Sequence, residues 1–300
     1  MPTDVDMWQS EFPALINNMT ESQVIDKGFK SFSQIKTMSQ SNPNGYWYLF
    51  GEPNRYSGMS GEKFAHVFRY YEKGLKAGNS HVKIIGPSLL NWDYTCIGCS
   101  GTYLCDGKVT KGYQCGKVWF RDFIDTYETF YGKRPEVYAW AIDVYPLDWV
   151  NTPNSIMHAD IAIAQIIEMR EYLSDIPEYT ETPIWITELG LHIGYDGYGI
   201  NSSSELYPIG SYHWDKMGNY LVKVVDWLDA NSTPYNIEKW FFFATYKNII
   251  QVEQDGYMGI TLFDAPEIST PINCLGATYK SRVLKTQKSN CDSSGNVILE

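Results

Sequence analysis

Two glutamates stand at the ends of short apolar runs, where a carboxylate could serve acid–base or nucleophilic chemistry. Glu52 comes two residues after the run at 46–50 (YWYLF), and Glu188 comes directly after the run at 183–187 (PIWIT). A Pro or a Gly follows each glutamate within two residues, so both runs predict buried strands that finish at a loop. Two carboxyl groups about 5–5.5 Å apart across a glycosidic bond can cleave it with retention, one as acid/base and one as nucleophile.

Each glutamate taken alone also fits a structural role. A Glu after a strand is often a helix cap or the partner in a surface salt bridge. Two such sites in one chain, with two further strand patterns between them, favour a shared active site. In parallel barrels the carboxyl ends of the strands form the active-site face, and this is where Glu52 and Glu188 are expected.

The two runs resemble the motifs of a large clan of retaining (β/α)8 glycoside hydrolases. In that clan Asn-Glu-Pro ends the fourth strand and Thr/Ser-Glu-(Leu/Phe/Tyr)-Gly ends the seventh, to which residues 51–53 and 187–190 are similar. Within the clan the chain most resembles the glycosyl hydrolase catalytic core group, over roughly residues 40–285. The resemblance implies that Glu52 is the general acid/base, that Glu188 is the nucleophile, and that no metal or organic cofactor is required.

The first motif departs from the family at one position, because Gly51 stands where the family has Asn. In the family that Asn side chain hydrogen-bonds the 2-hydroxyl of the sugar, a contact that strengthens in the transition state. Gly51 cannot make this contact. Three alternatives follow: Asn54 or Asn91 supplies the donor, turnover is weakened, or the chain binds glycans without cleaving them.

The remaining sequence alternates between helical and strand patterns. Helices are predicted over residues 60–77, 118–131, 161–173 and 212–230, and further strands over 82–88, 137–146 and 239–245. A hairpin at 259–264 is expected to lead to a last helix within 271–284. This order predicts the α/β class, with a parallel sheet that right-handed crossovers close into a (β/α)8 TIM barrel.

The front of the chain is short for such a barrel. Whole barrels need about 250 residues and eight strands, but only 45 residues precede Tyr46. We therefore expect a barrel that lacks its first strands, with residues 5–8 as the remnant of one strand and 22–39 as a helix. Residues 1–300 are expected to form one domain, with a Cys-rich loop insert at about 93–117.

Aromatic residues are abundant, at 15% of the chain, and sugar rings stack on aromatic faces. Most aromatic side chains are expected in the core, and these include Trp47, Trp140 and Trp240. The candidates for stacking on sugars lie on predicted loops or at a helix start, and they are Trp92, Trp149 and Trp214.

Other candidate binding residues lie near the ends of the sixth and seventh strands. Asp143 could contact a sugar hydroxyl, or it could simply cap the following turn. Tyr145 could hydrogen-bond Glu188 and keep it ionised. The other residues expected to line the sugar subsites are Trp185, His192 and Tyr195.

Four of the six cysteines fall in one loop, at Cys96, Cys99, Cys105 and Cys115. Their spacing is compatible with a zinc site, which could form a module that recruits a protein partner, or with two disulfides. Disulfides are favoured because a polysaccharide substrate lies outside the cell. Cys274 and Cys291 are a candidate third pair, and the expected location is extracellular or at the cell surface.

Composition excludes some classes of partner. The net charge of −11 disfavours binding to nucleic-acid phosphates, for which a basic face is expected. No run of eighteen apolar residues and no charged-plus-apolar leader are present, so neither a membrane span nor a retained signal peptide is visible. The predicted partner is an oligo- or polysaccharide, and the sequence does not predict an oligomeric state.

The sequence therefore predicts a retaining glycosidase that acts by double displacement. The resemblance points to a β-glucan as substrate, with xylan or mannan as alternatives. The competing hypothesis is a relative that binds glycans with weak turnover or none.

Overall fold

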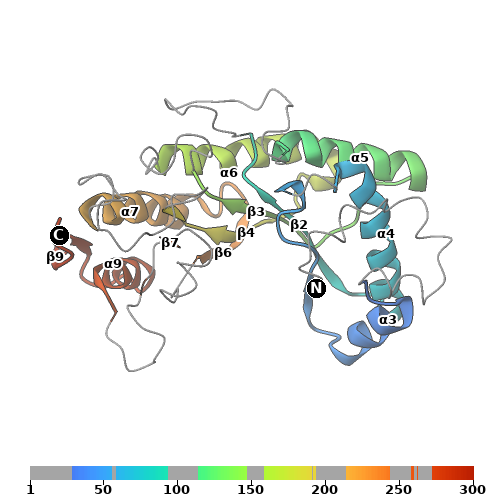
Figure 1. Ribbon diagram of the computed structural model, residues 1–300, viewed down its shortest axis with the longest axis horizontal. Coiled ribbons are helices and arrows are strands. Elements are labelled where there is room, and N and C mark those ends of the chain that lie inside the picture. The colour runs from blue at the N-terminus through green and yellow to red at the C-terminus, as the bar shows by residue number, and fades with distance from the viewer. Residues whose placement is uncertain are drawn as a thin grey trace. The chain divides into compact units, whose positions relative to one another are not determined.

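The computed structural model of the 300-residue chain is shown in Figure 1. The structure describes residues 29–55, 59–93, 114–146, 159–190, 192–193, 214–243, 258–259, 262 and 272–300. The predicted remnant strand at residues 5–8 and nearly all of the predicted Cys-rich insert lie outside these ranges.

A five-stranded parallel sheet in the order β1-β2-β3-β4-β6 positions the candidate site. Its strands are β1 (Tyr46–Tyr48), β2 (Lys83–Leu90), β3 (Ala139–Val144), β4 (Ile184–Leu189) and β6 (Ile237–Phe242). The strands of this sheet keep their sequence order, as in a barrel built from successive right-handed βα crossovers. In the register, Tyr46 pairs with Lys83, and Leu90 pairs with Asp143. The predicted α/β class is confirmed, and the sheet is part of a (β/α)8 barrel.

The remaining elements are helices and two short antiparallel pairs. The α-helices are α3 (Phe32–Ser41), α4 (Gly61–Gly78), α5 (Gly116–Tyr131), α6 (Ala159–Ser174), α7 (Trp214–Asn231) and α9 (Cys274–Val283). Short 3-10 helices cover Pro53–Arg55 (η2) and Pro177–Tyr179 (η3). The short strands are β5 (His192–Ile193), β7 (Met258–Gly259), β8 (Ser289–Cys291) and β9 (Val297–Leu299). None of the helices in the described ranges is long and apolar enough to cross a membrane.

Several predicted boundaries need correction. The helix expected at 22–39 is described only as α3, from Phe32 to Ser41, because Ser31 caps it in a capping box with Gln34. Most of the expected hairpin at 259–264 lies outside the described residues, and β7 at its start pairs antiparallel with β5. Strand β4 runs on through Glu188, where the sequence suggested that the strand ended before it.

The chain packs as two compact units. Unit 1 holds the described parts of Met1–Trp92, Cys105–Asp143 and Glu171–Trp185. Unit 2 holds those of Asp93–Leu104, Val144–Arg170 and Ile186–Glu300. The expectation of one domain over residues 1–300 stays a prediction.

Aromatic side chains fill unit 1 where α4 meets α5. The ring of Phe64 lies 5.0 Å from that of Trp119 and 5.2 Å from that of Phe50. Gly61 lets the helices approach, because a Cβ there would come within 2.3 Å of the Trp119 carbonyl oxygen. Burial of a large apolar side chain stabilises a fold by roughly 1.5–3 kcal/mol. The chain just before Glu52 is therefore anchored to the helix layer through Phe50.

A buried carboxylate also ties α4 to α5. Glu72 is fully buried and accepts from Lys76 Nζ at 2.6 Å, from Arg69 Nη1 at 2.8 Å and from the Tyr127 hydroxyl. Burial alone would raise the pKa of Glu72, but these hydrogen bonds outweigh it and lower that pKa. A buried charge is tolerated when it is paired in this way. Glu72 is thus a structural carboxylate that holds α4 against α5.

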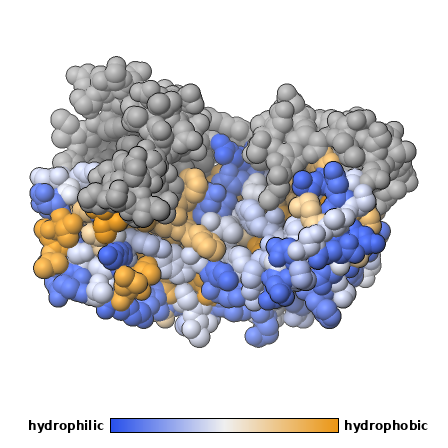
Figure 2. Space-filling model, turned by 90° about the horizontal axis from the view of Figure 1, so that it is seen from below, coloured by the Kyte–Doolittle hydropathy of each residue, from blue (hydrophilic) through white to orange (hydrophobic). Residues whose placement is uncertain are grey.

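Unit 2 ends in a covalently closed segment. Helix α7 packs closely on β8, since a Cβ on Gly218 would come within 2.3 Å of Asn290 Oδ1. The predicted Cys274–Cys291 disulfide is confirmed, and it joins the start of α9 to the end of β8. Figure 2 shows apolar surface on the side where Figure 1 draws α9 and β9. The exposed apolar side chains of these segments are Val283, Leu284, Val297, Ile298 and Leu299.

Removing this disulfide is expected to destabilise unit 2. The bond closes a loop with a sequence separation of 17 residues, and a loop of this size gives about 3 kcal/mol by limiting the unfolded chain. The double variant Cys274→Ser/Cys291→Ser should therefore lose about 3 kcal/mol of unfolding free energy in denaturant titrations followed by circular dichroism. The matched control is Ser294→Ala in the turn between β8 and β9. An unchanged unfolding midpoint in the double variant would contradict the prediction.

Candidate active site

Glu52 lies on a strained but well-held stretch of backbone after β1. Phe50 and Glu52 have φ angles of 65° and 47°, in the left-handed region that is unfavourable for residues with a Cβ. Backbone hydrogen bonds to β2 fix this stretch: Ser88 N–H donates to Phe50 O at 3.1 Å, and Glu52 N–H donates to Ser88 O at 2.8 Å. Strain of this kind costs of order 1–3 kcal/mol per residue and clusters at functional sites.

Burial and the nearby cation Arg55 act in opposite directions on the pKa of Glu52. Its side chain is only 15% exposed, and Arg55 Nη1 lies 3.2 Å from Glu52 Oε2. Burial raises the pKa of Glu52 above its usual value, although Arg55 acts to lower it. A carboxyl with a raised pKa is suited to donating a proton near neutral pH.

Glu188 is the second-last residue of β4, and it has a hydroxyl partner. The Tyr145 hydroxyl donates to Glu188 Oε2 at 2.6 Å, which is the contact that the sequence suggested. A donor at this distance favours the ionised carboxylate. Gly190 allows the chain after Glu188 to pass close to the end of β6, because a Cβ there would come within 2.2 Å of Phe243 O. Tyr220 donates to Gly190 O at 3.5 Å.

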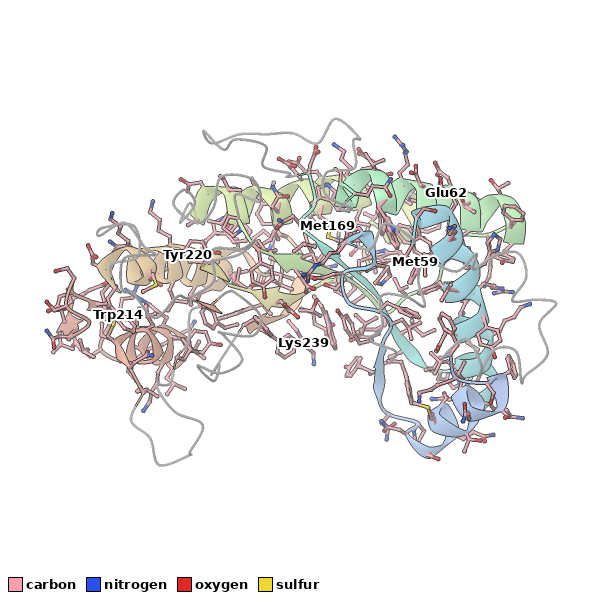
Figure 3. All side chains as sticks on the ribbon, in the orientation of Figure 1. Met59, Glu62, Met169, Trp214, Tyr220 and Lys239 are labelled. Carbon is pink, nitrogen blue, oxygen red and sulfur yellow. A yellow bond between two sulfur atoms is a disulfide. The ribbon has the colours of Figure 1, made fainter. Side chains whose placement is uncertain are left out.

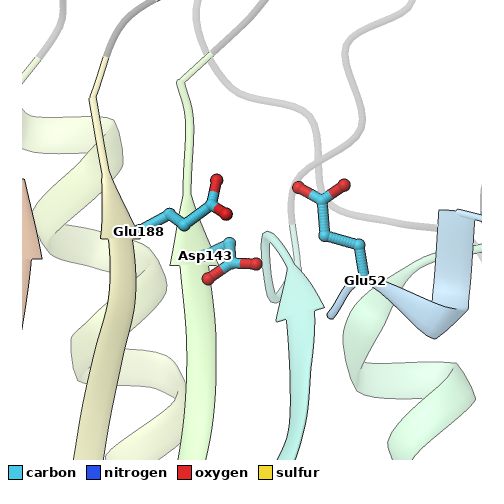
Figure 4. Close-up of side chains that lie close together, drawn as sticks. All are labelled: Glu52, Asp143 and Glu188. Atoms are coloured by element: carbon cyan, nitrogen blue, oxygen red, sulfur yellow. The ribbon is translucent and has the colours of Figure 1, made fainter. Parts of the chain in front are cut away.

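Figure 4 shows the carboxylates of Glu52, Asp143 and Glu188. One oxygen of each lies within 4.8 Å of an oxygen from each of the others. Like charges this close disfavour ionisation of all three groups, so such a cluster tends to keep a proton. The spacing is compatible with oxygen ligands to a cation, and it is also compatible with the carboxyl pair of a retaining glycosidase, for which about 5–5.5 Å is typical.

The two asparagines that could have replaced the family Asn are buried. Asn54 is 1% exposed, and its amide donates to Leu90 O at 3.0 Å and to Gln114 O at 2.9 Å while its oxygen accepts from Leu90 N. Asn91 is fully buried and has a φ of 53°. These side chains lie in the core around the end of β2, so their burial does not support sugar binding, which stays a prediction for both.

Two of the tryptophans proposed for sugar binding also belong to the core. Trp92 is fully buried, with its ring 5.5 Å from that of Phe120, so it offers no face to a sugar. Trp185 is 7% exposed and packs on Tyr46 and Tyr138, with ring centroids 4.9 and 6.4 Å away. Tyr46 begins β1, so Trp185 lies toward the strand end opposite to Glu188.

Of the remaining candidate sugar-binding residues, some lie within the described ranges and two lie outside them. Asp143 is fully buried near the end of β3, and its contact with a sugar stays a prediction. Trp214, labelled in Figure 3, begins α7 and is half-buried beside Gly295, where a Cβ would come within 2.9 Å of its Nε1. His192 begins β5, and its contact with a sugar stays a prediction. Trp149 and Tyr195 lie outside the described residues.

Two residues near Glu52 were missed by the sequence reasoning. Arg55 was detectable as a cation three residues after Glu52 in a turn. Tyr48 was not detectable, because its nearness to Gly51 depends on the local backbone. A Cβ on Gly51 would lie 3.1 Å from the Tyr48 hydroxyl oxygen, so this hydroxyl stands beside the position from which the family Asn side chain would start.

The cysteines that can be described are disulfide-bonded. They are Cys115, Cys274 and Cys291. Cys96, Cys99 and Cys105 lie outside the described ranges. A disulfide at Cys115 removes one of the four thiolates of the zinc alternative, which therefore loses support.

Comparison with known proteins identifies the family of this chain. The model of the family described as glycosyl hydrolase catalytic core matches residues 9–261, and the chain belongs to this family. A search of curated proteins found no match.

Similar solved structures are glycoside hydrolases of low sequence identity. One is a glucosidase from Croceicoccus marinus, at 10% identity and a TM-score of 0.50, covering 90% of this chain and 51% of that chain. Another is an endo-1,4-beta-xylanase from Penicillium canescens, at 12% identity and a TM-score of 0.49, covering 94% and 74% of the two chains. The chain thus spans about half the length of the glucosidase. At this identity the likeness to the glucosidase shows the fold.

The variant Arg55→Ala is expected to raise the pKa of Glu52 further. Arg55 is the cation that lowers this pKa against the effect of burial, so its loss leaves burial less opposed. A carboxyl ¹³C NMR titration of the full chain measures the shift directly and needs no substrate. Arg121→Ala is the matched control, because Arg121 pairs with Asp122. A lower Glu52 pKa in Arg55→Ala, or an equal rise in the control, would contradict the assignment.

Proposed function

We propose that this chain is a retaining glycosidase that hydrolyses the β-glycosidic bonds of a polysaccharide. The observation that carries the proposal is the pair of carboxyl groups, Glu52 and Glu188, with oxygens within 4.8 Å of each other. Membership of a glycosyl hydrolase family supports it. The resemblance noted from the motifs favours a β-glucan, with xylan and mannan as alternatives.

In the first step the Glu188 carboxylate attacks the anomeric carbon and forms a glycosyl ester. The bond to the leaving oxygen breaks, and Glu52 gives its proton to that oxygen. The raised pKa of Glu52 supports this role, since the group must hold a proton at the start. The hydrogen bond from Tyr145 to Glu188 supports the ionised form of the nucleophile.

In the second step Glu52, now ionised, takes a proton from water. The resulting hydroxide equivalent attacks the anomeric carbon and releases Glu188 as a carboxylate. Two inversions give net retention, and the proton that left Glu52 is restored. This sequence of steps uses only side chains and water.

We propose that the Tyr48 hydroxyl takes over the sugar contact of the family Asn. Tyr48 Oη lies 3.1 Å from the Cβ position of Gly51, and the hydroxyl can donate or accept a hydrogen bond. Tyr48 is half-buried, so a ligand near Gly51 can approach it. A side chain larger than Gly at position 51 would crowd this hydroxyl.

The second candidate function is glycan binding without turnover. The observation that favours it is Gly51, which removes a side chain that the resemblance assigns to transition-state stabilisation. The two functions differ in whether Glu52 and Glu188 are needed for chemistry or only for holding a ligand.

The disulfides support a location in an oxidising compartment. Cys115, Cys274 and Cys291 are all disulfide-bonded, and such bonds persist outside the cytosol. We therefore propose an extracellular or cell-surface location, where polysaccharide substrates are also found.

Release of reducing sugar from laminarin, barley glucan, xylan and mannan tests the proposal. Wild type should act on at least one polymer, and Glu52→Gln and Glu188→Gln should each lose at least about a hundredfold in rate. Glu171→Gln, on the exposed side of α6, is the matched control and should keep full activity. With an activated aryl glycoside, azide should rescue Glu188→Gly and give the inverted glycosyl azide, whereas Glu52→Gly with azide should give the retained product.

The outcomes separate the two candidate functions. Equal activity of wild type and Glu188→Gln would overturn the catalytic assignment. A folded wild type that binds oligosaccharides but releases no sugar would support glycan binding instead.

Paired variants test the role of Tyr48. Tyr48→Phe is expected to lower kcat/KM by about tenfold on a substrate with a 2-hydroxyl, the loss of one hydrogen bond, and to leave the 2-deoxy analogue unaffected. Adding Gly51→Asn to Tyr48→Phe should restore part of the loss, since the added side chain no longer meets the hydroxyl. Gly51 has no positive φ, so its backbone accepts Asn. Equal losses on both substrates would show that Tyr48 acts on folding only.

A further inference from the structure

We propose a second, non-catalytic sugar-binding site in unit 2. A cavity of about 180 Å³ lies among the carboxyl-terminal end of α7, strand β6 and the end of α9. The residues that give it its character are Trp240, Asp229, Ser232 and Arg282, and apolar side chains such as Val283 complete the lining. The inferred ligand is an uncharged hexose or pentose unit of a glycan.

The cavity is far from the chemistry of Glu188 along the fold of unit 2. Asp229 and Ser232 stand at the carboxyl-terminal end of α7, and Arg282 stands at that of α9. In β/α barrels the helices run back to the edge of the sheet opposite to the carboxyl ends of the strands. A ligand in this cavity would therefore leave Glu188 free to react.

One wall of the cavity is aromatic. Trp240 is half-buried on β6, next to Lys239, which is labelled in Figure 3. Tyr279 on α9 holds the indole by an edge contact, with ring centroids 5.9 Å apart and planes at 83°. Such a wall suits the apolar C–H face of a sugar ring, and the sequence had suggested only a core role for this Trp.

Polar groups are placed beside that wall. Asp229 Oδ1 pairs with Lys285 Nζ at 2.9 Å, which leaves the second carboxylate oxygen to accept from a ligand hydroxyl. The Ser232 hydroxyl donates to Leu228 O at 2.5 Å and keeps lone pairs to accept. The Arg282 Nε–H is buried and has no acceptor among the described residues. A buried donor in this state costs free energy.

The charges around the cavity balance. Arg282 pairs with Asp226 at 3.5 Å and with Glu300 at 2.6 Å, and Lys288 pairs with Asp226 at 3.4 Å. Together with the pair between Lys285 and Asp229, three cations face three anions. No net charge remains to attract a phosphate or a carboxylate, so the cavity favours a neutral ligand with several hydroxyls.

The size of the cavity sets the length of the ligand. Drug-sized ligands occupy about 300–1,000 Å³, so 180 Å³ suits a single sugar ring, with the rest of a chain lying over the surface outside. Such a site would hold a polysaccharide near the protein. The choice of a sugar rests in part on the proposed function, but the pocket does not depend on Glu52 or Glu188.

Tryptophan NMR on the full chain tests the site. A ¹⁵N-tryptophan-labelled Glu188→Gln chain, in which turnover is blocked, is titrated with laminaripentaose, xylopentaose and galacturonic acid. The Trp240 indole resonance is expected to shift with at least one neutral oligosaccharide and not with the anionic sugar. Trp240→Leu should weaken the affinity for the same oligosaccharide, measured by isothermal titration calorimetry, at least about tenfold.

Two further variants serve as controls. Trp227→Leu is the matched control, because Trp227 is half-buried on α7, packs on Tyr235 with ring centroids 5.4 Å apart, and does not line the cavity. It should leave the affinity unchanged. Ser232→Ala removes only a hydroxyl, so it probes the cavity even where Trp240→Leu fails to fold, and it should weaken binding as well.

The outcomes distinguish this site from the proposed function. A Trp240 resonance that stays fixed at saturating neutral sugar, or that responds more strongly to galacturonic acid, would overturn the site. If wild type hydrolyses a polysaccharide but the Trp240 resonance does not shift, the glycosidase proposal holds and the second site is overturned. A response of Trp240 in a chain that hydrolyses nothing would support the site and remove the glycosidase.

Discussion

The pairing of residues 50–52 with Ser88 is the constraint on which the candidate site depends. Ser88 bonds through its backbone to both Phe50 and Glu52, and these two residues keep left-handed φ angles as a result. Without β2 as a template, chain strain of this size would relax to extended backbone. The direction of the Glu52 side chain, and the nearness of Tyr48 to Gly51, both follow from this pairing.

The electrostatics of the site then follow from how each carboxylate is enclosed. Glu52 is largely buried, and its cationic partner Arg55 is 40% exposed. The effect of burial is therefore larger than that of Arg55, and the pKa of Glu52 rises. Glu188 receives a hydroxyl hydrogen bond from Tyr145, which favours the charged form. Glu72 shows the contrast: three donors surround it and its pKa falls. The number of donors, more than burial, separates a structural carboxylate from one that can hold a proton.

The sequence predicted the strands, and the place of the two glutamates at the ends of β1 and β4, because these signals are local. Apolar runs followed by Pro or Gly mark β1 and β4, and amphipathic spacing marks α4 and α5. The burial of several candidate binding residues was not predicted, because burial is decided by elements that lie far away in the sequence. Trp92 looked like a loop residue, but β2 extends to Leu90 and α5 covers the ring with Phe120. The Asn54 amide donates hydrogen bonds to the backbone carbonyls of Leu90 and Gln114, and no local sequence pattern reveals these contacts.

The separation that we propose between catalytic chemistry and glycan binding has a physical basis. Strand ends bring carboxylates together because parallel strands finish at one edge, and the geometry there must be held to fractions of an ångström. The helix ends at the opposite edge of the sheet need less exact positions. Side chains such as Trp240 and Asp229 can therefore line a cavity there without disturbing the strand register. Arg282 is paired with acidic partners, so the cavity is polar but has no net charge that would attract an ion. A neutral glycan is the class of ligand that suits both conditions, since it presents an apolar face to the indole and hydroxyls to the carboxylate.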